Sequence, residues 1–558
     1  MLACSAGPLF GQTAGGALVQ PAALEATGTY GLRRLDPLLT GRDVTIAAVC
    51  RSLTYIGGHP QYDYRLNMNH VCFAGRDIQF ADSSEDYGAV SPHATAIGGI
   101  LAGRDPLGFH PEIGRFYYEG AAPEARVDVY EFWRFLSLYV FGSKPFTADI
   151  LTMSVGSVFE DWWTRGIDYL AAEYGLLVFA GIGNGTAVRD PIFYPGAAAN
   201  VIGVGVVDSV KTGVAADSLE MFSLPRPEHS SRGPTIDERC KPDIVAPGNC
   251  LAPSADSVNG YDITGDWTSF ATPAAAGTAA LLVQKAASDP ALSAAARGKG
   301  ANCVMKAILM NSAAKLPYWH KGRPTREDDN VAILDYLQGA GMLNAVDAYR
   351  QLVAGRGEPG PVGPHGWDNN VIEKKPGVQH TYAFEIAEPA GQMLTATLVW
   401  NRHFQPVYPF VPLTAADSDM ALEVWAVDPN SQRVLDFSDS VNDNVEHIWC
   451  ALDPQYTRYE IVVTFSELAG DVEKYPIERY GLAWGISPAD NRDNIFWYDI
   501  NLDGKIDSDD LVLLMNRLVE SDKDAIGFGP GDIDLNGMVD IADLTAFMAR
   551  FKQTQPSD

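Results

Sequence analysis

The chain has 558 residues, 46% of them hydrophobic and 20% charged, so roughly two to four domains with buried cores are expected. Acidic residues outnumber basic ones by 70 to 41, and the net charge of −29 repels the phosphates of nucleic acids. This balance argues against a nucleic-acid partner, and the absence of an apolar run of ~20 residues argues against a transmembrane segment.

Residues 1–28 show neither the basic start nor the continuous apolar stretch of a signal peptide. We expect either that the chain has no signal peptide or that its start is truncated, and this segment is a candidate for disorder. The seven cysteines are an odd number without metal-binding spacing, which favours mostly unpaired thiols, with Cys240 and Cys250 as the candidate pair.

From residue 29 to 356, short apolar runs alternate with stretches of helical character. The runs at 44–49, 150–156, 176–181 and 201–207 are continuously apolar, as strands of a parallel sheet covered on both faces are. Helices are predicted for 162–174, 271–285, 303–314 and 342–352. The alternation predicts a doubly wound α/β domain with a parallel sheet.

Three polar residues stand where such a sheet places its ligands. Ser269, in DWTSFATPAAAG, precedes a helix of small residues, and His93, in SPHATAIGGILAG, begins another. Asn184, in VFAGIGNG, follows a predicted strand, and ligands of open α/β sheets bind at the carboxyl ends of strands. Each residue alone would be an ordinary surface or capping residue, whereas their order along the chain indicates a catalytic site.

These motifs resemble those of the subtilase family of serine peptidases over residues 30 to 355, and TMSVGS and KPDIVAPG fit the same family. The resemblance implies a subtilisin-like fold in which Ser269 is the nucleophile and His93 the general base. Asn184 and the backbone N–H of Ser269 would hold the oxyanion. The resemblance also implies that a peptide substrate pairs, as an added strand, with a segment formed by Ser154, Val155 and Gly156.

The chain departs from the family where a strand should end in the catalytic aspartate. The predicted strand at 44–49 is followed by Cys50, and a neutral thiol neither orients a histidine nor stabilises an imidazolium well. Trp267 stands where the family has glycine, either as a plug in the substrate pocket or as a determinant of specificity. Ala94 also replaces a glycine, which is a mild change.

Other acidic groups could replace the missing aspartate. Asp43 precedes the same strand and would lie ~20 Å away, too far to reach His93. Glu85 and Asp86 precede His93 on a predicted loop and are the weaker candidates that remain, and oxidation of Cys50 to a sulfinate ranks below them. Two interpretations are therefore about equally supported. The chain is either an impaired or rescued peptidase or a pseudoenzyme that still binds peptides.

Residues 357–366 form a Pro/Gly-rich linker, and the region 367–488 changes to short alternating strands without helical periodicity. This pattern predicts an all-β sandwich or jelly roll, and it resembles the jelly-roll domain that follows the catalytic domain in some bacterial subtilases. Four aspartates could bind calcium there, but turn aspartates are usually structural, so no ligands are assigned: Asp417, Asp419, Asp439 and Asp443.

The segment 493–553 contains two acidic loops, beginning at Asp499 and Asp532, which repeat at a spacing of 33 residues. Each loop carries oxygen-bearing residues at positions 1, 3, 5, 9 and 12 and glycine at position 6, the arrangement that wraps Ca²⁺. The pattern resembles dockerin modules, small α-helical units that bind cohesin modules. The resemblance implies two Ca²⁺ sites with these ligands, Lys505 and Met538 through their carbonyls: Asp499, Asn501, Asp503, Lys505, Asp507, Asp510, Asp532, Asp534, Asn536, Met538, Asp540 and Asp543.

Together these features predict a serine endopeptidase that hydrolyses peptide bonds through an acyl-enzyme and is impaired by Cys50. Its expected partners are a peptide or protein substrate and a cohesin module of a scaffold or surface protein. Calcium-dependent folding favours an extracellular or cell-surface location. The alternative is a catalytically inactive peptide-binding or adhesion protein with the same tether.

Overall fold

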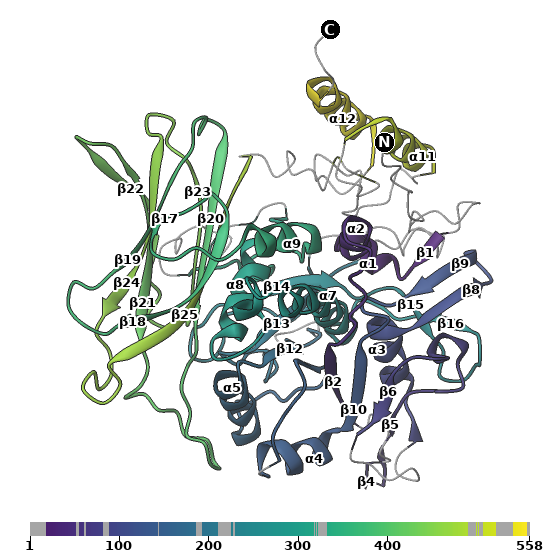
Figure 1. Cartoon of the computed structure of the whole chain (residues 1–558). Helices are drawn as coiled ribbons and strands as arrows, with labels where there is room; N and C mark the ends of the chain where they lie inside the picture. The colour runs from purple at the N-terminus through teal and green to yellow at the C-terminus, as the bar shows by residue number, and fades with distance from the viewer. Residues whose placement is uncertain are drawn as a thin grey trace.

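The structure is a computed structural model, drawn in Figure 1, and it describes the following residues: 18–51, 55–57, 59–60, 63–81, 89–142, 144–185, 192–209, 225–226, 229–316, 319, 321, 332–488, 498, 500, 506–520 and 539–554. No helix within these ranges combines the length and the apolar composition needed to cross a membrane.

A parallel sheet of seven strands lies at the centre of the first domain. From one edge to the other its strands are β14 (Ile244–Pro247), β13 (Ile202–Val207), β12 (Leu177–Gly181), β11 (Ile150–Met153), β2 (Thr45–Cys50), β10 (Arg126–Glu131) and β6 (Ile78–Phe80). Every neighbouring pair is parallel, and the interior strands are almost fully buried, which explains their continuous apolar sequences.

The two faces of this sheet are covered by different helices, as the alternation along β2 shows. Ile46, Ala48 and Cys50 belong to a core shared with α3 (Pro92–Ala102) and α7 (Thr268–Ser288). Ala47 and Val49 belong to a second core shared with α5 (Trp162–Tyr174). The sheet is therefore doubly wound, as predicted, and the side chain of Cys50 faces the layer that contains α3 and α7.

The order of the strands reverses beside β2. The chain forms β6 and β10 on one side of β2 and then crosses to β11 on the other side. In open parallel sheets, ligands bind at the carboxyl ends of the strands next to such a switch point. The residues that follow β2, β11 and β12 are therefore the first place to look for a site.

The predicted strands and helices are present, and three of the helices differ from their predicted limits by two or three residues at each end. α5 has the predicted limits, whereas α7 begins before residue 271 and already contains Ser269. α8 (Ala301–Asn311) ends three residues before its predicted end, and α9 (Ala345–Ala354) begins late because the Asn344 side chain caps it, accepting the Asp347 N–H at 3.1 Å. Terminal capping contacts, not apolar periodicity, set these limits.

The chain between residues 18 and 28, expected to be a candidate for disorder, has regular structure. β1 (Leu18–Gln20) joins β9 (Gly114–Glu119) and β8 (Arg104–His110) in a three-stranded sheet. The helix α1 (Ala22–Ala26) follows and is mostly buried, and α2 (Thr29–Leu35) comes next. Apolar contacts with the rest of the domain therefore order a segment that has no periodicity of its own.

Short elements complete this domain outside the large sheet. They are the strands β3 (Tyr55–Ile56), β4 (His59–Pro60), β5 (Asp63–Arg65), β7 (Ala89–Val90), β15 (Leu251–Pro253) and β16 (Tyr261–Ile263), the four-residue helix α4 (Phe132–Phe135), the 3₁₀ turns Val71–Phe73 and Ser293–Ala295, and the π-helical turn Leu136–Val140. The pairing of β5 with β7 matters for the site, because β7 leads directly into α3.

Residues 360–488 form two facing sheets around an apolar core. One sheet contains β17 (Gly360–Pro361), β19 (His380–Glu385), β24 (Arg458–Glu467), β21 (Asp419–Val427) and β22 (Gln432–Ser438). The other contains β18 (Gly366–Glu373), β25 (Ile477–Pro488), β20 (Gln392–Trp400) and β23 (Val445–Ala451). All pairs except that of β17 with β19 are antiparallel, as expected for strands of alternating sequence.

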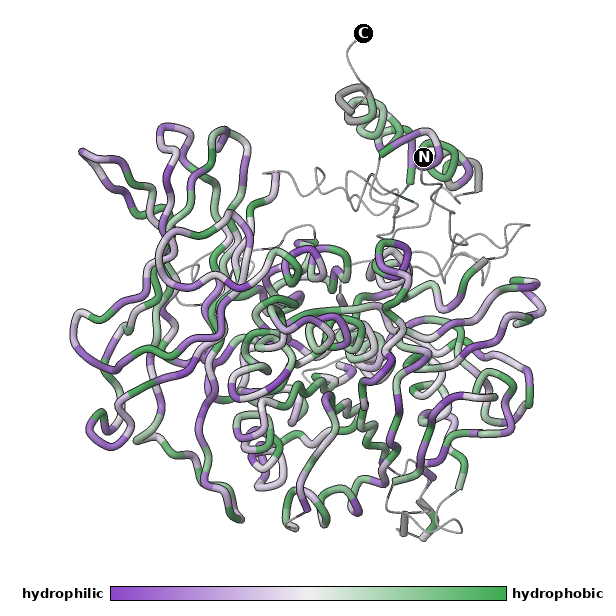
Figure 2. The backbone as a smooth tube through the Cα atoms, viewed as in Figure 1, coloured by the Kyte–Doolittle hydropathy of each residue, from purple (hydrophilic) through white to green (hydrophobic). Residues whose placement is uncertain are grey.

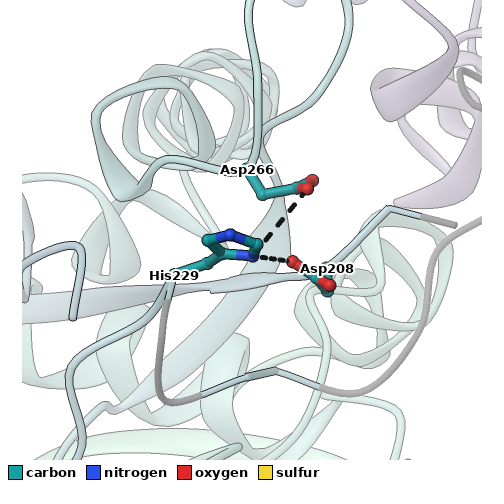
Figure 3. Close-up of side chains that lie close together, drawn as sticks. All are labelled: Asp208, His229 and Asp266. Atoms are coloured by element: carbon teal, nitrogen blue, oxygen red, sulfur yellow. Dashed lines mark hydrogen bonds and ion pairs between the residues drawn. The ribbon is translucent and has the colours of Figure 1, made fainter. Parts of the chain in front are cut away.

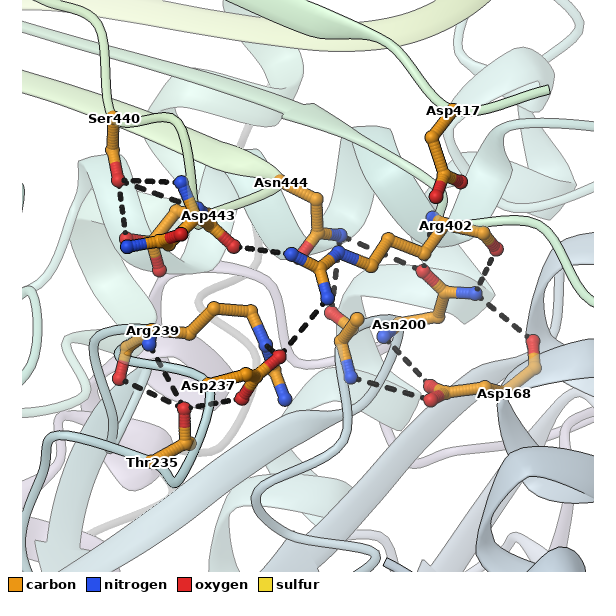
Figure 4. Close-up of polar contacts among 12 residues, drawn as sticks. Asp168, Asn200, Thr235, Asp237, Arg239, Arg402, Asp417, Ser440, Asp443 and Asn444 are labelled. Atoms are coloured by element: carbon orange, nitrogen blue, oxygen red, sulfur yellow. Dashed lines mark hydrogen bonds and ion pairs between the residues drawn. The ribbon is translucent and has the colours of Figure 1, made fainter. Parts of the chain in front are cut away.

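The β domain packs against α8 of the first domain. The Gly481 backbone of β25 approaches α8 so closely that a Cβ atom would lie 2.4 Å from the Val304 nitrogen. Polar contacts surround this apolar interface (Figure 4): Asn200 accepts the Arg402 backbone N–H at 2.8 Å, and Asp443 accepts the Cys240 N–H at 2.8 Å. The two domains therefore share one continuous interface.

Two helices close the described chain, α11 (Ser508–Glu520) and α12 (Ile541–Thr554), and they pack against each other through Leu514 and Phe547, both fully buried. In Figure 2 both helices contain apolar and polar residues, and several outer loops of the chain are hydrophilic. Cys240 and Cys250 are free thiols, as are the other cysteines of the described chain.

Candidate active site

Ser269 lies in the first turn of α7, at the carboxyl ends of the parallel strands. Its backbone carbonyl accepts a hydrogen bond of 2.7 Å from the Ser154 hydroxyl, which joins α7 to the segment after β11. Because the first N–H groups of a helix have no intrahelical partner, this position favours negative charge near the Ser269 hydroxyl.

Asn184 follows β12 and is turned with its oxygen toward α7. Its Oδ1 atom accepts hydrogen bonds from the Thr268 backbone N–H at 2.9 Å and from the Thr268 hydroxyl at 2.8 Å. These contacts cap α7 from a distant segment and explain why the helix begins at Thr268. They also leave the Nδ2 donor of Asn184 without a partner among the described residues and available to a ligand.

His93 occupies the second position of α3, whose start is fixed by Ser91. The Ser91 hydroxyl accepts the Ala94 N–H at 3.1 Å, and the Ser91 N–H donates to the Arg65 carbonyl at 2.8 Å. Burial lowers the pKa of His93 to about 4, with the charge of Asp63 acting in the opposite direction. The imidazole is therefore neutral at pH 7 and able to accept a proton, although it is a weak base.

Cys50 ends β2 beneath this site. Its side chain is 2% exposed and belongs to the core that also contains Ala94 of α3 and Ala271 of α7. Burial raises the pKa of the Cys50 thiol to about 12, so the group is neutral at physiological pH. Among the described residues, no hydrogen bond joins His93 to Cys50 or to Ser269.

Asp63 on β5 is a buried carboxylate that the sequence reasoning missed. It is 6% exposed and close enough to His93 for its charge to affect the pKa of the imidazole. Asp43 precedes β2, at the end opposite to Cys50, and Glu85 and Asp86 lie outside the described residues. The sequence did contain a signal for Asp63. It is an acidic residue between two tyrosines, in a short segment before the helix that begins near His93.

A cleft of about 640 Å³ brings the predicted residues together. Ser269, His93, Asn184 and Trp267 line it, together with the segment formed by Ser154, Val155 and Gly156. Cys50 does not line it. The cleft has further walls that the sequence reasoning did not predict, namely Arg51, Gly181, Gly183, Phe193, Thr264, Thr268 and Phe270.

Two large rings narrow the cleft. Trp267 is 43% exposed and precedes α7. Phe193 packs so tightly against residues 154–156 that a Cβ atom added to Gly156 would lie 2.8 Å from the Cβ of Phe193. An extended peptide bound along this segment would therefore meet Phe193 and Trp267, and both rings limit the size of the side chains that fit.

A charged cluster lies directly before Trp267 (Figure 3). His229 hydrogen-bonds to Asp208 and lies 4.0 Å from Asp266, and the Ser209 hydroxyl donates to Asp266 at 2.9 Å. The ligand atoms of this histidine and the two aspartates are close enough together to hold a metal ion. Arg226 pairs with Asp208 at 2.9 Å, so part of this cluster is already an ion pair within the protein.

The described parts of the two predicted calcium loops have the same internal contacts. Asp510 accepts the Asp507 N–H at 2.8 Å, and Asp543 accepts the Asp540 N–H at 2.7 Å. Asp510 and Asp543 are fully buried, and they stand at position 12 of the predicted loops, where a carboxylate would bind Ca²⁺. The other predicted ligands lie outside the described residues: Asp499, Asn501, Asp503, Lys505, Asp532, Asp534, Asn536 and Met538.

Comparison with known proteins identifies relatives of the first domain. The sequence model of the Subtilase family matches residues 54–341, which is more than half of the chain. Serine protease AprX of Bacillus subtilis (strain 168) is 30% identical over 300 residues, which cover 47% of this chain and 62% of that protein. Pyrolysin of Pyrococcus furiosus is 29% identical over 248 residues, which cover 40% of this chain and 16% of that protein.

A solved structure, the serine protease of Aeromonas sobria, is similar with 14% identity and a TM-score of 0.37, covering 80% of this chain and 89% of that one. The matched part of the chain spans less than two thirds of the length of AprX and of pyrolysin. The family match covers His93, Asn184 and Ser269 and six of the seven strands of the parallel sheet, and it begins after β2. By this match, the chain belongs to the subtilase family.

Proposed function

We propose that this protein is a serine endopeptidase that hydrolyses peptide bonds through an acyl-enzyme and works slowly because Cys50 occupies the position of the catalytic aspartate. The observation that carries this proposal is the convergence of Ser269, His93 and the free amide donor of Asn184 on one cleft beside the switch point of the sheet. Membership of the subtilase family supports the same chemistry.

In the proposed reaction, the Ser269 hydroxyl attacks the carbonyl carbon of the scissile peptide bond while His93 takes its proton. The Nδ2 donor of Asn184 and the backbone N–H of Ser269 hold the negative oxygen that forms. His93 then returns the proton to the leaving amine, and water hydrolyses the acyl-enzyme by the same steps in reverse. Catalytic hydrogen bonds are often long without substrate, so contact of His93 with Ser269 is expected to form when a peptide binds.

The buried, neutral thiol of Cys50 explains why the reaction would be slow. Losing the aspartate of a Ser-His-Asp triad costs ~10⁴-fold in turnover, because the histidine loses its orientation and its counter-charge. This corresponds to ~5.5 kcal/mol of transition-state stabilisation. The remaining groups still exceed the uncatalysed rate, so weak activity is the expected result.

The second candidate function is peptide binding without catalysis, and the neutral Cys50 and the depressed pKa of His93 favour it. In this case the cleft would still bind an extended peptide along Ser154, Val155 and Gly156. The narrowing by Trp267 and Phe193 is compatible with either function.

An active-site label separates the two candidates. The purified full chain, its Ser269→Ala variant and its Cys50→Asp variant are incubated with a fluorophosphonate, and the labelled protein is measured by mass spectrometry. Slow labelling of the unmodified chain that disappears in Ser269→Ala supports the peptidase. Labelling only after Cys50→Asp supports the binding protein, and silence of all three forms would contradict a catalytic site.

We further propose that the segment 493–553 is a dockerin-like tether, which binds two Ca²⁺ ions and a cohesin module on a scaffold or surface protein, outside the cytoplasm. The repeated contacts of Asp507 with Asp510 and of Asp540 with Asp543 support this assignment. We also propose that the β domain, the expected jelly roll, stabilises the first domain through the interface with α8.

A further inference from the structure

One cation faces a cleft that is otherwise uncharged. Among the described residues that line the cleft, Arg51 alone carries a full charge at neutral pH, because the imidazole of His93 is neutral there. The described lining contains no carboxylate and no lysine. A single positive charge in such a cleft favours an anionic ligand over a neutral or cationic one.

Arg51 stands beside the segment expected to bind the substrate. Val49 of β2 and Met153 of β11 form the last parallel pair of these strands, and Arg51 and residues 154–156, which follow shortly after that pair, line the same cleft. A peptide extended along residues 154–156 would therefore pass within reach of the guanidinium group. The guanidinium group would then act on the peptide side chains that are close to the bond that Ser269 would attack.

The guanidinium group of Arg51 is held in place but keeps its donors unused. It lies 5.7 Å from the centre of the Phe132 ring, a cation–π contact that restricts its position. No hydrogen bond or ion pair to it is present within the described residues. Burial raises the pKa of Glu131 and Arg51 acts against this, but the Glu131 carboxylate is committed to the Arg134 N–H at 2.8 Å, at the start of α4.

We propose that Arg51 selects peptides that carry an aspartate or glutamate side chain within a residue or two of the scissile bond. The planar fork of N–H donors of an arginine matches the two oxygens of a carboxylate. The side chains of glutamine and lysine do not offer two such oxygens. This inference rests on the proposed function of the cleft as a peptide site. It concerns which peptides bind, whereas the triad concerns whether they are cleaved.

Binding is measured with the full chain carrying Ser269→Ala, so that no peptide is consumed. The probes are fluorescein-labelled octapeptides with amidated carboxyl ends, in which a single glutamate moves along an uncharged sequence, with glutamine and lysine counterparts. Fluorescence anisotropy should show roughly tenfold tighter binding of glutamate than glutamine at one or two adjacent positions. A peptide with a free carboxyl end and no glutamate tests whether the cleft prefers the carboxylate at the end of a peptide. Tighter binding of this peptide than of the glutamate peptides would overturn the proposal.

Substitutions of Arg51 identify the group responsible. Arg51→Gln should remove the glutamate preference, and Arg51→Glu should invert it in favour of lysine. Arg115→Glu is the matched control, because it changes the net charge equally at an exposed position of β9 outside the cleft lining, and it should keep the preference. Circular dichroism of each variant checks folding. Arg51→Lys keeps the positive charge with a minimal change in structure, and it should weaken the preference for glutamate without removing it.

Three results would overturn the proposal: equal binding of glutamate and glutamine peptides at every position, a glutamate preference that persists in Arg51→Gln, or no peptide binding at all. Failure of the proposed catalysis looks different. In that case Ser269→Ala binds glutamate peptides selectively, while the chain with Ser269 intact neither cleaves them nor reacts with the fluorophosphonate.

Discussion

At the scale of single residues, the chemistry of the cleft depends on what surrounds His93. The imidazole is desolvated, the thiol of Cys50 at the end of β2 is neutral, and the buried carboxylate of Asp63 only partly offsets the cost of a positive charge on His93. Burial disfavours the imidazolium that must form when Ser269 loses its proton. With position 50 as that of the catalytic aspartate, as proposed above, its neutral thiol would affect both the orientation and the basicity of His93.

The pH dependence of Ser269 labelling tests this environment. The rate requires neutral His93, so it should rise with pH through the pKa of about 4 and remain level to pH 8. In Cys50→Asp, a nearby carboxylate favours the imidazolium, so the midpoint should move upward by at least one pH unit, and the rate at pH 8 should rise by ~10²- to 10⁴-fold.

Cys50→Asn is the control for that change, since asparagine resembles aspartate in size and carries no charge. Its midpoint should stay with that of the unmodified chain. A midpoint between pH 6 and 7 before any substitution would contradict the desolvated position of His93.

At the scale of the elements, a buried charge network joins the β14 edge of the sheet to α8. Asp243, directly before β14, contacts the ammonium groups of Lys241 at 2.5 Å and Lys306 at 2.9 Å, and all three residues are at least 98% buried. Its carboxylate also accepts the Gly203 N–H of β13 at 2.7 Å. Burial lowers the pKa of Lys241 to about 7, with Asp243 acting in the opposite direction.

Asp243→Asn should therefore lower the free energy of unfolding by ~3–5 kcal/mol, because it leaves two buried ammonium groups without their counter-charge. Urea denaturation followed by circular dichroism measures this change. The control is Glu373→Gln, which breaks an exposed ion pair with Lys375 and should cost less than ~1 kcal/mol. An equal loss in the free energy of unfolding for the two variants would show that the charge of Asp243 does not stabilise the buried network.

At the scale of the whole molecule, the β domain completes the core of the first domain. Trp367, Val399 and Val445 belong to the same apolar cluster as the inner side of α8. Buried polar contacts join the same surfaces, among them the hydrogen bond of 2.8 Å between Lys315 and His447. An interface of this kind makes the two domains unfold together.

Removing the β domain should therefore destabilise the first domain. The fragment 1–356 is expected to aggregate or to melt at least ~10 °C below the full chain, since it exposes apolar surface of α8. Scanning calorimetry makes the measurement, and the fragment 1–492, which keeps the interface, should melt within ~2 °C of the full chain. A fragment 1–356 as stable as the full chain would refute the shared core.

Calcium should act on a different part of the molecule. Titration of the metal-free full chain with Ca²⁺ should increase the helical circular dichroism signal, because a cation bound by the predicted loops, in which Asp510 and Asp543 are buried carboxylates, would stabilise the helices that follow each loop. The double variant Asp510→Ala/Asp543→Ala should show no gain. A Ca²⁺ response that persists in this variant would count against these loops.

The sequence by itself determined the elements and the residues of the site that belong to motifs. Continuous apolar runs marked the interior strands at 44–49, 150–156, 176–181 and 201–207, since a strand buried on both faces can hold little else. Ser269, His93 and Asn184 were found because each follows or begins such an element in a fixed order. The absence of an acidic residue at position 50 was equally visible.

Only the tertiary structure decided which side chains meet in the cleft. Arg51 and Phe193 line the cleft far along the chain from Ser269, and the buried Asp63 acts on His93 from another segment; no local pattern reports a contact between segments that far apart. The start of α7 at Thr268 depends on Asn184, which caps it from another strand. The structure likewise showed that residues 18–28 are ordered and that the β domain shares the core of the first, because burial is a property of packed surfaces and not of the order of residues.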